Sequence, residues 1–429
     1  MFRVLTRIFF YTILIVFIST FTKAHSSAFY IKPKAYLNVE SGQMIYGKVL
    51  GIEDEKIISI SDAAPLRKKI INIESLYLIP GLIDCHAHIF FTQVKEDVTF
   101  ENALLRESKL TDEFRTKRAK EFLRDYLNEG FTSVCDLGNS GQFLDVQLKK
   151  TILKNSSYPD FFVSGPGIAT NKAQFYPNTA DTLVRKEYTI VDEKTDLENV
   201  LKEYQERNVD ILKIYADNSP GVGGMDEAML DKIYKSQKRE FFKKITFHAI
   251  EKAAIEKLSK LKVVSVEHAS EGTWDVDQEN TYLTLTDLPS SILKEFNYYK
   301  KVFYEYQLFR AQKAYQKKIK LVFGPDFYFH SNEKGFNRAQ YVKRSIEAWQ
   351  EAKIPSLEII KALTVNPANS LRLNGKQGVI KVGAKANIIG LSDDPSIKIE
   401  TINNPFFIMN KGVIIKNSEL NSSKPDKKR

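Results

Sequence analysis

The chain has 429 residues, of which 43% are hydrophobic and 27% are charged, so its composition excludes a disordered or low-complexity protein. Its two cysteines exclude a disulfide scaffold and any metal cluster ligated by cysteine alone. More than half of the formal net charge of +10 lies in the first 24 and the last six residues. The rest is too weak for the basic face of a nucleic-acid-binding protein, so no nucleic-acid partner is expected.

The first 24 residues have the pattern of a secretory signal peptide. Arg3 and Arg7 precede an apolar run from Ile8 to Ile18, and Thr22-Lys23-Ala24 places small residues where signal peptidase cleaves. The apolar run is short for a bilayer span of about 20 residues, so a cleaved signal is favoured over the alternative, a membrane anchor. We therefore expect an exported protein, periplasmic or secreted, with no stable membrane insertion after cleavage.

The remaining chain divides into β-rich ends and a longer middle. Residues 28–80 contain short alternating strands with glycine turns, which predict an antiparallel β unit. Short strands and turns return in residues 373–420, before a basic tail at 421–429. We expect both ends to build one small β-sandwich domain, into which the middle of the chain is inserted.

The middle of the chain, residues 81–372, alternates apolar runs with longer helical segments. A parallel (β/α)₈ TIM barrel is the fold that this alternation predicts for a region of about 250 to 300 residues. The predicted strands lie at residues 82–88, 131–136, 161–165, 209–215, 245–249, 263–268, 281–286 and 320–326.

One helical segment of the middle region, residues 290–318, is rich in aromatic side chains and lysines. Tyr298, Phe303, Tyr306 and Phe309 have a rough helical spacing. We expect one amphipathic helix that packs its aromatic face on the barrel, with a partner-binding groove as the alternative.

Histidines stand at the ends of the predicted barrel strands. His86 and His88 are two residues apart at the end of the first strand, where side chains at i and i+2 share a face. His248 ends the fifth strand, His268 ends the sixth and Asp326 ends the eighth. The carboxyl ends of barrel strands meet on one face, so these side chains should converge. Imidazole and carboxylate groups suit Zn²⁺, with Fe, Mn, Co or Ni as substitutes.

Further candidates lie on the same face. Lys213 stands inside the fourth strand, where a buried lysine has to shed or share its charge. Adding CO₂ to this lysine gives a carbamate, an anion able to bridge two metal ions. Tyr215 is two residues further along and is either a donor to the substrate or a rim residue. His330 follows Asp326 by four residues and is a weaker candidate for orienting the substrate.

The segments GLIDCHAH, ILKIY, FHA, VEHA and GPDF, with ALTVNPANSLRLNGKQGVIKVGAKANIIGLSDDP, resemble the amidohydrolase superfamily over about residues 35 to 415. The nearest branch is the imidazolonepropionase-related and Xaa-Pro dipeptidase (prolidase-like) group. The resemblance implies a barrel flanked by a β-sandwich and two divalent metal ions, preferably Zn²⁺. It implies that Asp326 also moves the proton in catalysis, and that the metal ligands are His86, His88, carbamylated Lys213, His248, His268 and Asp326.

Three functions stay open at this stage. The favoured one is hydrolysis of an amide or dipeptide C–N bond by a binuclear metal enzyme. A deaminase is the alternative, because His248 and Glu251 have the spacing of a proton-shuttle pair. The third is a barrel that binds without catalysis. The sequence also leaves open a disulfide between Cys85 and Cys135 and the formation of a homo-oligomer.

Overall fold

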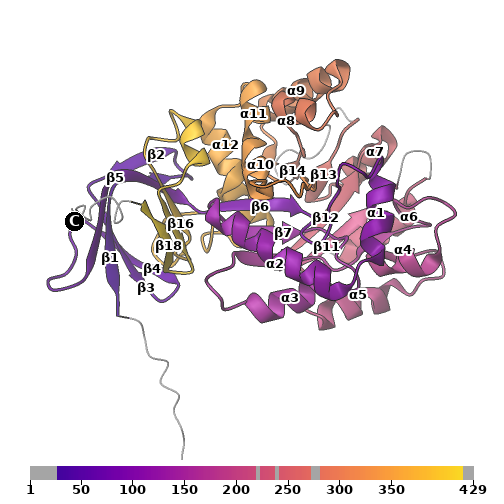
Figure 1. The fold of residues 1–429 in the computed structure, drawn as a ribbon, viewed down its shortest axis with the longest axis horizontal. Helices are drawn as coiled ribbons and strands as arrows, with labels where there is room; N and C mark the ends of the chain where they lie inside the picture. Colours follow the sequence, from indigo (N-terminus) through magenta and orange to yellow (C-terminus); the bar gives the residue numbers. More distant parts are fainter. Residues whose placement is uncertain (1–26, 219–222, 237–240, 272–280, 419–429) are drawn as a thin grey trace, which may run out of the picture.

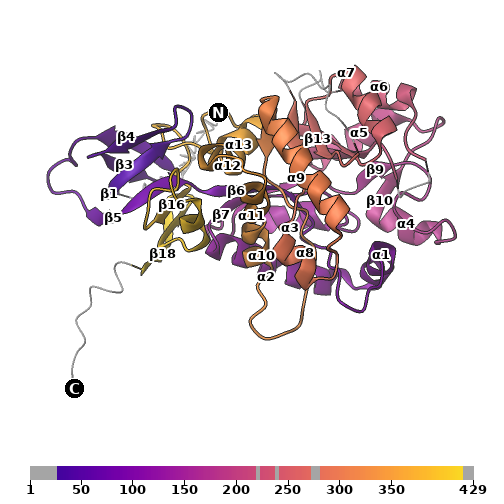
Figure 2. The ribbon, with the colours of Figure 1, turned by 90° about the horizontal axis from the view of Figure 1, so that it is seen from above.

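The computed structural model describes residues 27–218, 223–236, 241–271 and 281–418. The predicted signal peptide (1–24) and basic tail (421–429) lie outside these residues. None of the helices within the described ranges is long and apolar enough to cross a bilayer. Figures 1 and 2 show a β-rich part at one end of the molecule and a larger part of helices and strands beside it.

The β-rich part is an eight-stranded sheet, called here the end sheet, that takes strands from both ends of the chain. The two ends meet where β16 pairs antiparallel with β5, with Ile388 opposite Pro80. The strands are β1 (Phe29–Asn38), β2 (Gln43–Tyr46), β3 (Val49–Glu53), β4 (Lys56–Ser61), β5 (Ile70–Pro80), β16 (Ile388–Leu391), β17 (Phe407–Asn410) and β18 (Val413–Asn417).

The prediction of a wholly antiparallel unit at residues 28–80 is wrong for one strand pair. β1 runs parallel to β5, with Tyr30 opposite Ile70. A parallel pair needs a connection of about a dozen residues or more, and the chain through β2, β3 and β4 supplies it. The alternating pattern could not show this, because it gives the buried face of a strand and not its direction.

The end sheet has a hydrophobic core of its own. Buried side chains from its two chain segments pack together in one cluster, apart from the main core of the molecule. Its members include Ile31, Leu50, Ile73, Leu78, Ile388 and Phe407.

Each of the eight runs predicted as barrel strands contains a strand. Their pairings are parallel, and they form a three-stranded sheet, β6-β7-β8, and a seven-stranded sheet that begins with the short strands β9 and β10 at one edge. These strands are β6 (Leu82–Ala87), β7 (Phe131–Asp136), β8 (Asp160–Val163), β9 (Gly167–Ala169), β10 (Tyr188–Ile190), β11 (Ile211–Tyr215), β12 (Lys244–Ala249), β13 (Ser265–His268), β14 (Tyr282–Thr284) and β15 (Lys320–Val322).

Backbone hydrogen bonds link the two parallel sheets. The Cys85 amide of β6 donates to the carbonyl of Phe323, just after β15, at 2.9 Å. The Asp210 amide, just before β11, donates to Val163 of β8 at 2.9 Å. A glycine allows the first contact, because a Cβ at Gly324 would lie 2.6 Å from the backbone nitrogen of His86. The end of β15 therefore reaches β6 closely.

The helices lie mainly around the parallel strands in Figures 1 and 2, and a large apolar core includes side chains from both. They are α1 (Phe100–Lys109), α2 (Asp112–Asn128), α3 (Leu144–Ile152), α4 (Asp181–Glu187), α5 (Leu197–Glu206), α6 (Glu227–Ser236), α7 (Lys252–Leu261), α8 (Ser290–Glu295), α9 (Lys301–Gln316), α10 (Arg338–Arg344), α11 (Ile346–Glu351), α12 (Ser356–Leu363) and α13 (Val365–Ser370), with a short 3₁₀ helix, η2 (Ile399–Asn403).

The predicted single helix at 290–318 is two helices, α8 and α9, and its aromatic face does not pack on the barrel. Tyr298, Phe303, Tyr306 and Phe309 are all exposed. The buried side of α9 is instead formed by Tyr304, Arg310, Ala311 and Ala314. Because alanine side chains are small, the face of α9 that carries them can pack closely against neighbouring elements. The prediction relied instead on the large aromatic side chains, which lie on the exposed face.

Candidate metal centre

The carboxyl end of β6 supplies two buried histidines. The Nδ1–H of His86 donates to the carboxylate of Glu267 at 2.9 Å. The Nδ1–H of His88 donates to the carbonyl oxygen of Gly138 at 2.9 Å. Such partners fix the ring orientation and the tautomer of a metal-binding histidine, leaving Nε2 as the free ligand atom.

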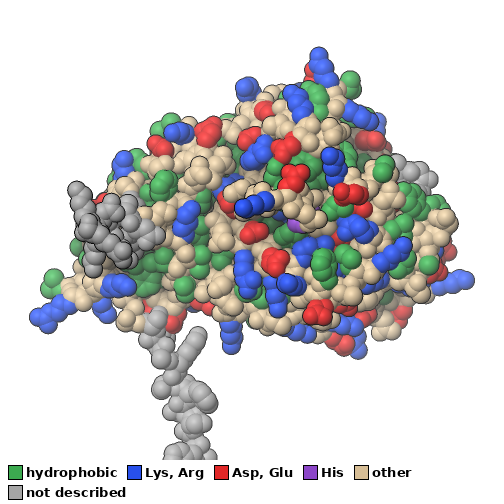
Figure 3. Space-filling model, viewed as in Figure 1, with side chains coloured by type: hydrophobic (Ala, Val, Ile, Leu, Met, Phe, Trp, Pro, Cys, Tyr) green, Lys and Arg blue, Asp and Glu red, His purple; other side chains and the backbone are tan. Residues whose placement is uncertain are grey.

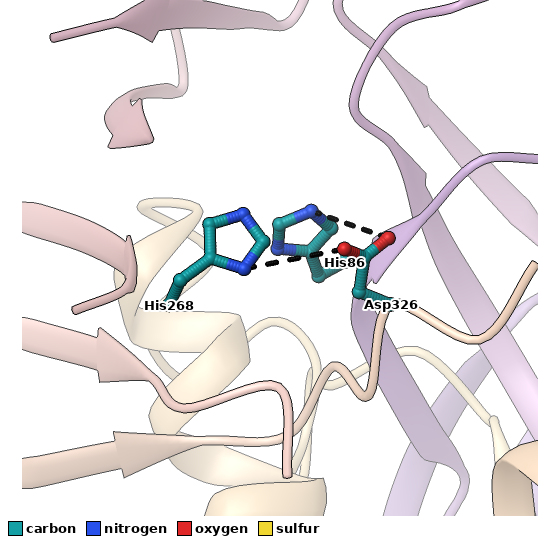
Figure 4. Close-up of side chains that lie close together, drawn as sticks. All are labelled: His86, His268 and Asp326. Atoms are coloured by element: carbon teal, nitrogen blue, oxygen red, sulfur yellow. Dashed lines mark ion pairs between the residues drawn. The ribbon is translucent and has the colours of Figure 1, made fainter. Parts of the chain in front are cut away.

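His268 from β13 and Asp326 after β15 lie against His86. One candidate ligand atom from each of the three residues falls within 4.8 Å of the other two. Figure 4 shows the Asp326 carboxylate facing both rings, 3.8 Å from His86 Nε2 and 4.0 Å from His268 Nδ1. The φ angles of His268 (66°) and Asp326 (52°) are both positive. Backbone strain of this kind is often found where side chains are positioned for function.

The other predicted ligands join the same cluster. Lys213 Nζ lies 3.2 Å from His86 Nε2, and His88 Nε2 lies 3.4 Å from Asp326 Oδ1. The His248 ring centre lies 4.4 Å from that of His268. The structure therefore brings all six predicted ligands together at the carboxyl ends of five strands. On the face seen in Figure 3, histidine is visible only at one small spot, in keeping with this burial.

Burial controls the charges in the cluster. It lowers the pKa of His86 to about 4, with the Lys213 charge adding to the effect. It likewise holds the pKa values of His88, His248 and His268 well below the usual range. The histidines are therefore neutral at pH 7, the form that ligates a metal. Burial also lowers the pKa of Lys213 to about 8 and raises that of Asp326 to about 7.

Two buried ligand atoms of the cluster have no hydrogen-bond partner among the described residues: His248 Nε2 and Asp326 Oδ1. Buried polar atoms are rarely left unpaired, because desolvation without a partner costs free energy. An imidazole nitrogen and a carboxylate oxygen are the donors that Zn²⁺ and similar ions bind. The residues present therefore fit a divalent metal ion.

The two other predicted site residues, Tyr215 and His330, differ in their distance from this centre. Tyr215 is buried, with its ring 4.8 Å from that of His248 and 5.2 Å from that of Tyr188. His330 packs its ring against Phe122 and Phe336, and none of its described contacts reaches the six ligands.

Glu251, the second half of the predicted proton-shuttle pair, begins a helix. It is the N-cap residue of α7, and its backbone amide donates to the Asp217 carboxylate at 2.8 Å. The carboxylate that approaches His248 is Asp217, 3.4 Å from Nε2. Asp217 was not predicted from the sequence, although it lies two residues beyond Tyr215 in the loop after β11.

A buried ion pair supports the centre and was also missed. Glu267 contacts His86 on one side and Lys244 Nζ at 2.9 Å on the other, and it accepts a hydrogen bond from Thr246. Although burial opposes it, the Lys244 charge and the His86 hydrogen bond hold the pKa of Glu267 well below its usual range. Glu267 and Lys244 carry the same signal as Lys213, because each is a charged residue inside a buried strand.

Arg338 at the start of α10 binds two loops, one carrying the proposed ligand His88 and the other carrying Asp326. Its buried guanidinium donates to the carbonyl oxygens of His88 and Phe91 after β6, both at 3.0 Å. It also donates to Phe327 after β15 at 2.9 Å. Backbone acceptors carry no residue-type signal, so the sequence could not reveal this role.

Comparison with known proteins identifies the family. The profile of the amidohydrolase family matches residues 77–418. The chain belongs to the amidohydrolase family. It is therefore an enzyme of the class that hydrolyses carbon–nitrogen bonds, and the family resemblance predicted from the sequence is confirmed. A search of curated proteins found no match.

Solved structures share the fold of this amidohydrolase at low sequence identity. A structure described as an amidohydrolase has 21% identity and a TM-score of 0.76, covering 91% of this chain and 99% of its own. A Xaa-Pro dipeptidase with bound methionine has 19% identity and a TM-score of 0.74, with coverages of 91% and 100%. The A. niger ochratoxinase has 18% identity and a TM-score of 0.76, with coverages of 91% and 96%.

Proposed function

We propose that this enzyme is a metal-dependent hydrolase of an amide or peptide-like C–N bond, with a dipeptide as one candidate substrate. The observation that carries the proposal is one buried cluster of ligand side chains drawn from five strand ends, in which two ligand atoms have no hydrogen-bond partner among the described residues. A Xaa-Pro dipeptidase and a prolidase are among the solved structures of similar fold, which supports this substrate class.

The proposal includes the architecture. The strands β6, β7, β8, β11, β12, β13, β14 and β15 would form one closed (β/α)₈ barrel at residues 81–372, with the two backbone links described above joining its sheets. The end sheet would be the β-sandwich domain of residues 28–80 and 373–420. In a closed barrel the strand ends meet on one face, which explains why the ligands converge.

Two divalent ions, preferably Zn²⁺, would be held by His86, His88, Lys213, His248, His268 and Asp326. When bound, such ions polarise the scissile carbonyl and lower the pKa of water. Lys213 fits the role best as a carbamate: its amine nitrogen adds to the carbon of CO₂ and loses one proton. The product places anionic oxygens, which are metal ligands, where an ammonium otherwise faces His86 Nε2.

The remaining chemistry falls to residues of the chain. The Asp326 carboxylate would take the proton of the attacking water and give it to the leaving amine as the C–N bond breaks. Glu267 and Gly138 hold the imidazoles of His86 and His88 in place through their Nδ1 atoms. Tyr215, whose ring packs against that of His248, would be a second donor to the substrate on the same face.

Metal analysis combined with a substrate panel tests the proposal. The purified enzyme should contain about two ions per chain and, after removal and return of Zn²⁺, should cleave Xaa-Pro, Xaa-Arg or N-acyl amino acid substrates. One ion per chain with ammonia release from a purine or pyrimidine would replace the proposal with the deaminase function. A purified protein that contains no metal and hydrolyses none of these substrates would contradict the proposal and favour a barrel that binds without catalysis.

The carbamate and export have separate tests. Enzyme prepared with ¹³C-labelled CO₂ should show a carbamate carbon signal that Lys213→Met lacks, and a signal of equal size in both proteins contradicts the modification. For export, supported only by the sequence of residues 1–24, N-terminal sequencing of the protein from a periplasmic or secreted fraction should begin near His25. An uncut chain in the membrane fraction contradicts cleavage.

A further inference from the structure

We propose that the substrate carries an aromatic or similarly bulky uncharged group next to the scissile bond, and that this group occupies a cavity beside Asp326. The inference rests on the proposed hydrolase function and narrows its substrate class. The cavity has a volume of about 250 Å³ and reaches from Asp326 to α8. The lining residues on which the argument depends are Leu288, Leu293, Phe296, Tyr298 and Phe329.

The aromatic wall of this cavity is held by contacts of its own. The Phe296 ring stacks on Phe329 with centres 4.8 Å apart, and Tyr298 lies 5.1 Å from Phe329. The Tyr298 hydroxyl accepts a hydrogen bond from Gln93 Nε2 at 3.0 Å. The cavity also has aliphatic lining residues, among them Leu288, whose backbone carbonyl accepts a hydrogen bond from Gln307 Nε2 of α9. The cavity is therefore a formed feature and not a gap between loose loops.

The size and apolar lining suit one ring. An apolar cavity of about 150 Å³ takes up benzene, so about 250 Å³ accommodates a phenyl or indole group with its linking carbon. A ring placed there could make edge or offset contacts with Phe296 and Phe329. Asp326, a proposed metal ligand, is one of the lining residues, so we place the linking carbon on its side of the cavity, next to the metal centre.

The charge of the lining excludes an acidic group. Among the described residues that line this cavity, Asp326 is the only Asp, Glu, Lys or Arg. The nearby cation Arg310 is engaged by Asp287 and by the carbonyl of His268, and Arg338 by three backbone carbonyls. A substrate carboxylate in the cavity would face Asp326 with neither of these cations free to pair with it.

A larger cavity that shares part of the aromatic wall does not fit the same group. It measures about 930 Å³, shares Phe296, Tyr298 and Phe329, and also carries Lys95, Glu96 and Glu333. A space of that size and polarity does not select an apolar ring. Of these two cavities, the smaller has Asp326 in its lining and no other charged side chain among its described lining residues.

A binding measurement tests the cavity independently of catalysis. Calorimetry should show phenylacetamide binding at least about tenfold more tightly than acetamide, because each buried carbon adds to apolar burial. The preference should remain in metal-free protein, since the leucine and aromatic side chains of the lining are not metal ligands. Leu293→Trp, which fills the cavity, should abolish the preference. Phe303→Ala, an exposed aromatic residue of α9 outside the cavity, should leave it unchanged.

Kinetics of matched substrates then test specificity. Two series vary one side of the amide at a time: N-acetyl-phenylalanine, N-acetyl-alanine and N-acetyl-aspartate, and phenylacetyl-glycine with acetyl-glycine. We expect the phenyl member of one series to have a kcat/KM about tenfold higher or more. Phe296→Ala should move the optimum to a naphthyl group and Leu293→Trp to a methyl group. Poor folding cannot produce shifts in opposite directions.

The outcomes separate the two proposals. Hydrolysis of these substrates without discrimination between phenyl and methyl overturns the cavity assignment and leaves the hydrolase function standing. Tight binding of phenylacetamide with no hydrolysis of any C–N substrate contradicts the proposed function while supporting the cavity. Equal binding of acetamide and phenylacetamide, or a Leu293→Trp variant that keeps the preference, overturns the assignment.

Discussion

The end sheet and the parallel strands bury different kinds of side chain. The core cluster of the end sheet is made of hydrophobic residues such as Leu50 and Phe407. The parallel strands bury Lys213, Lys244 and Glu267 with almost no exposure. Burying charge is costly and does not generally raise stability. The end sheet therefore packs a hydrophobic cluster of its own, whereas the parallel strands carry the cost of buried charge at the reactive centre.

The largest effect should come from the reactive centre itself. Asp326→Asn removes the proposed proton acceptor, and kcat should fall by about 10²- to 10⁴-fold, the usual contribution of a general acid–base residue. Steady-state kinetics on the substrate found in the panel would measure this loss. Asp62→Asn is the control, because its side chain is 87% exposed. Unchanged kcat in Asp326→Asn would remove this residue from the mechanism.

The next effect should come from the buried ion pair. Glu267→Gln leaves Lys244 charged and unpaired in the interior, and removing one partner of a buried pair costs about 3–5 kcal/mol of unfolding free energy. Urea denaturation would measure the change. The double variant Glu267→Gln/Lys244→Met should recover part of the loss. A single variant as stable as the parent protein would mean that the charge is not buried as described.

A somewhat smaller effect is expected in the end sheet. Leu50→Ala creates a cavity at a fully buried position and should cost about 2–5 kcal/mol of unfolding free energy. Metal content and kcat of the folded protein should stay as in the parent, because the end sheet has a core separate from the centre. If metal content fell together with stability, the contrast between the two parts would be wrong.

The smallest effect is expected at the surface of the end sheet. Lys32 and Glu74 form an ion pair at 2.5 Å, but both side chains are about half exposed (50% and 48%). Exposed pairs gain little because water and salt screen them. Glu74→Gln should therefore leave the midpoint of urea denaturation unchanged within error. A clear loss of stability would show that the charge matters even where it is solvated.

The sequence predicted the parallel strands well because their residues are buried and apolar over short runs. It did not predict the direction of β5 relative to β1, or the division of 290–318 into two helices. The direction of β5 depends on its pairing with β1, which is distant in the sequence. The helix division depends on which side of α9 packs against the rest of the molecule. Residue spacing shows neither.

The candidate centre was predicted from strand ends, and all six proposed ligands lie together. What the sequence missed are the residues that support them. Asp217 and Glu267 stand beside residues already selected, so closer attention to buried charge could have found them. Arg338 acts on backbone carbonyls of two distant loops, and this contact exists only once the chain has folded.

The pairing of β5 with β16 has a consequence for how the molecule forms. Pro80 lies opposite Ile388, so more than 300 residues separate the two strands in the sequence. While the polypeptide is being synthesised, β5 can find β1 but not its second neighbour, and one strand edge stays open until almost the whole chain has emerged. Open edges attract other chains, and slow long-range pairing extends that exposure. Chaperone dependence and aggregation of truncated nascent chains should therefore be concentrated at this sheet.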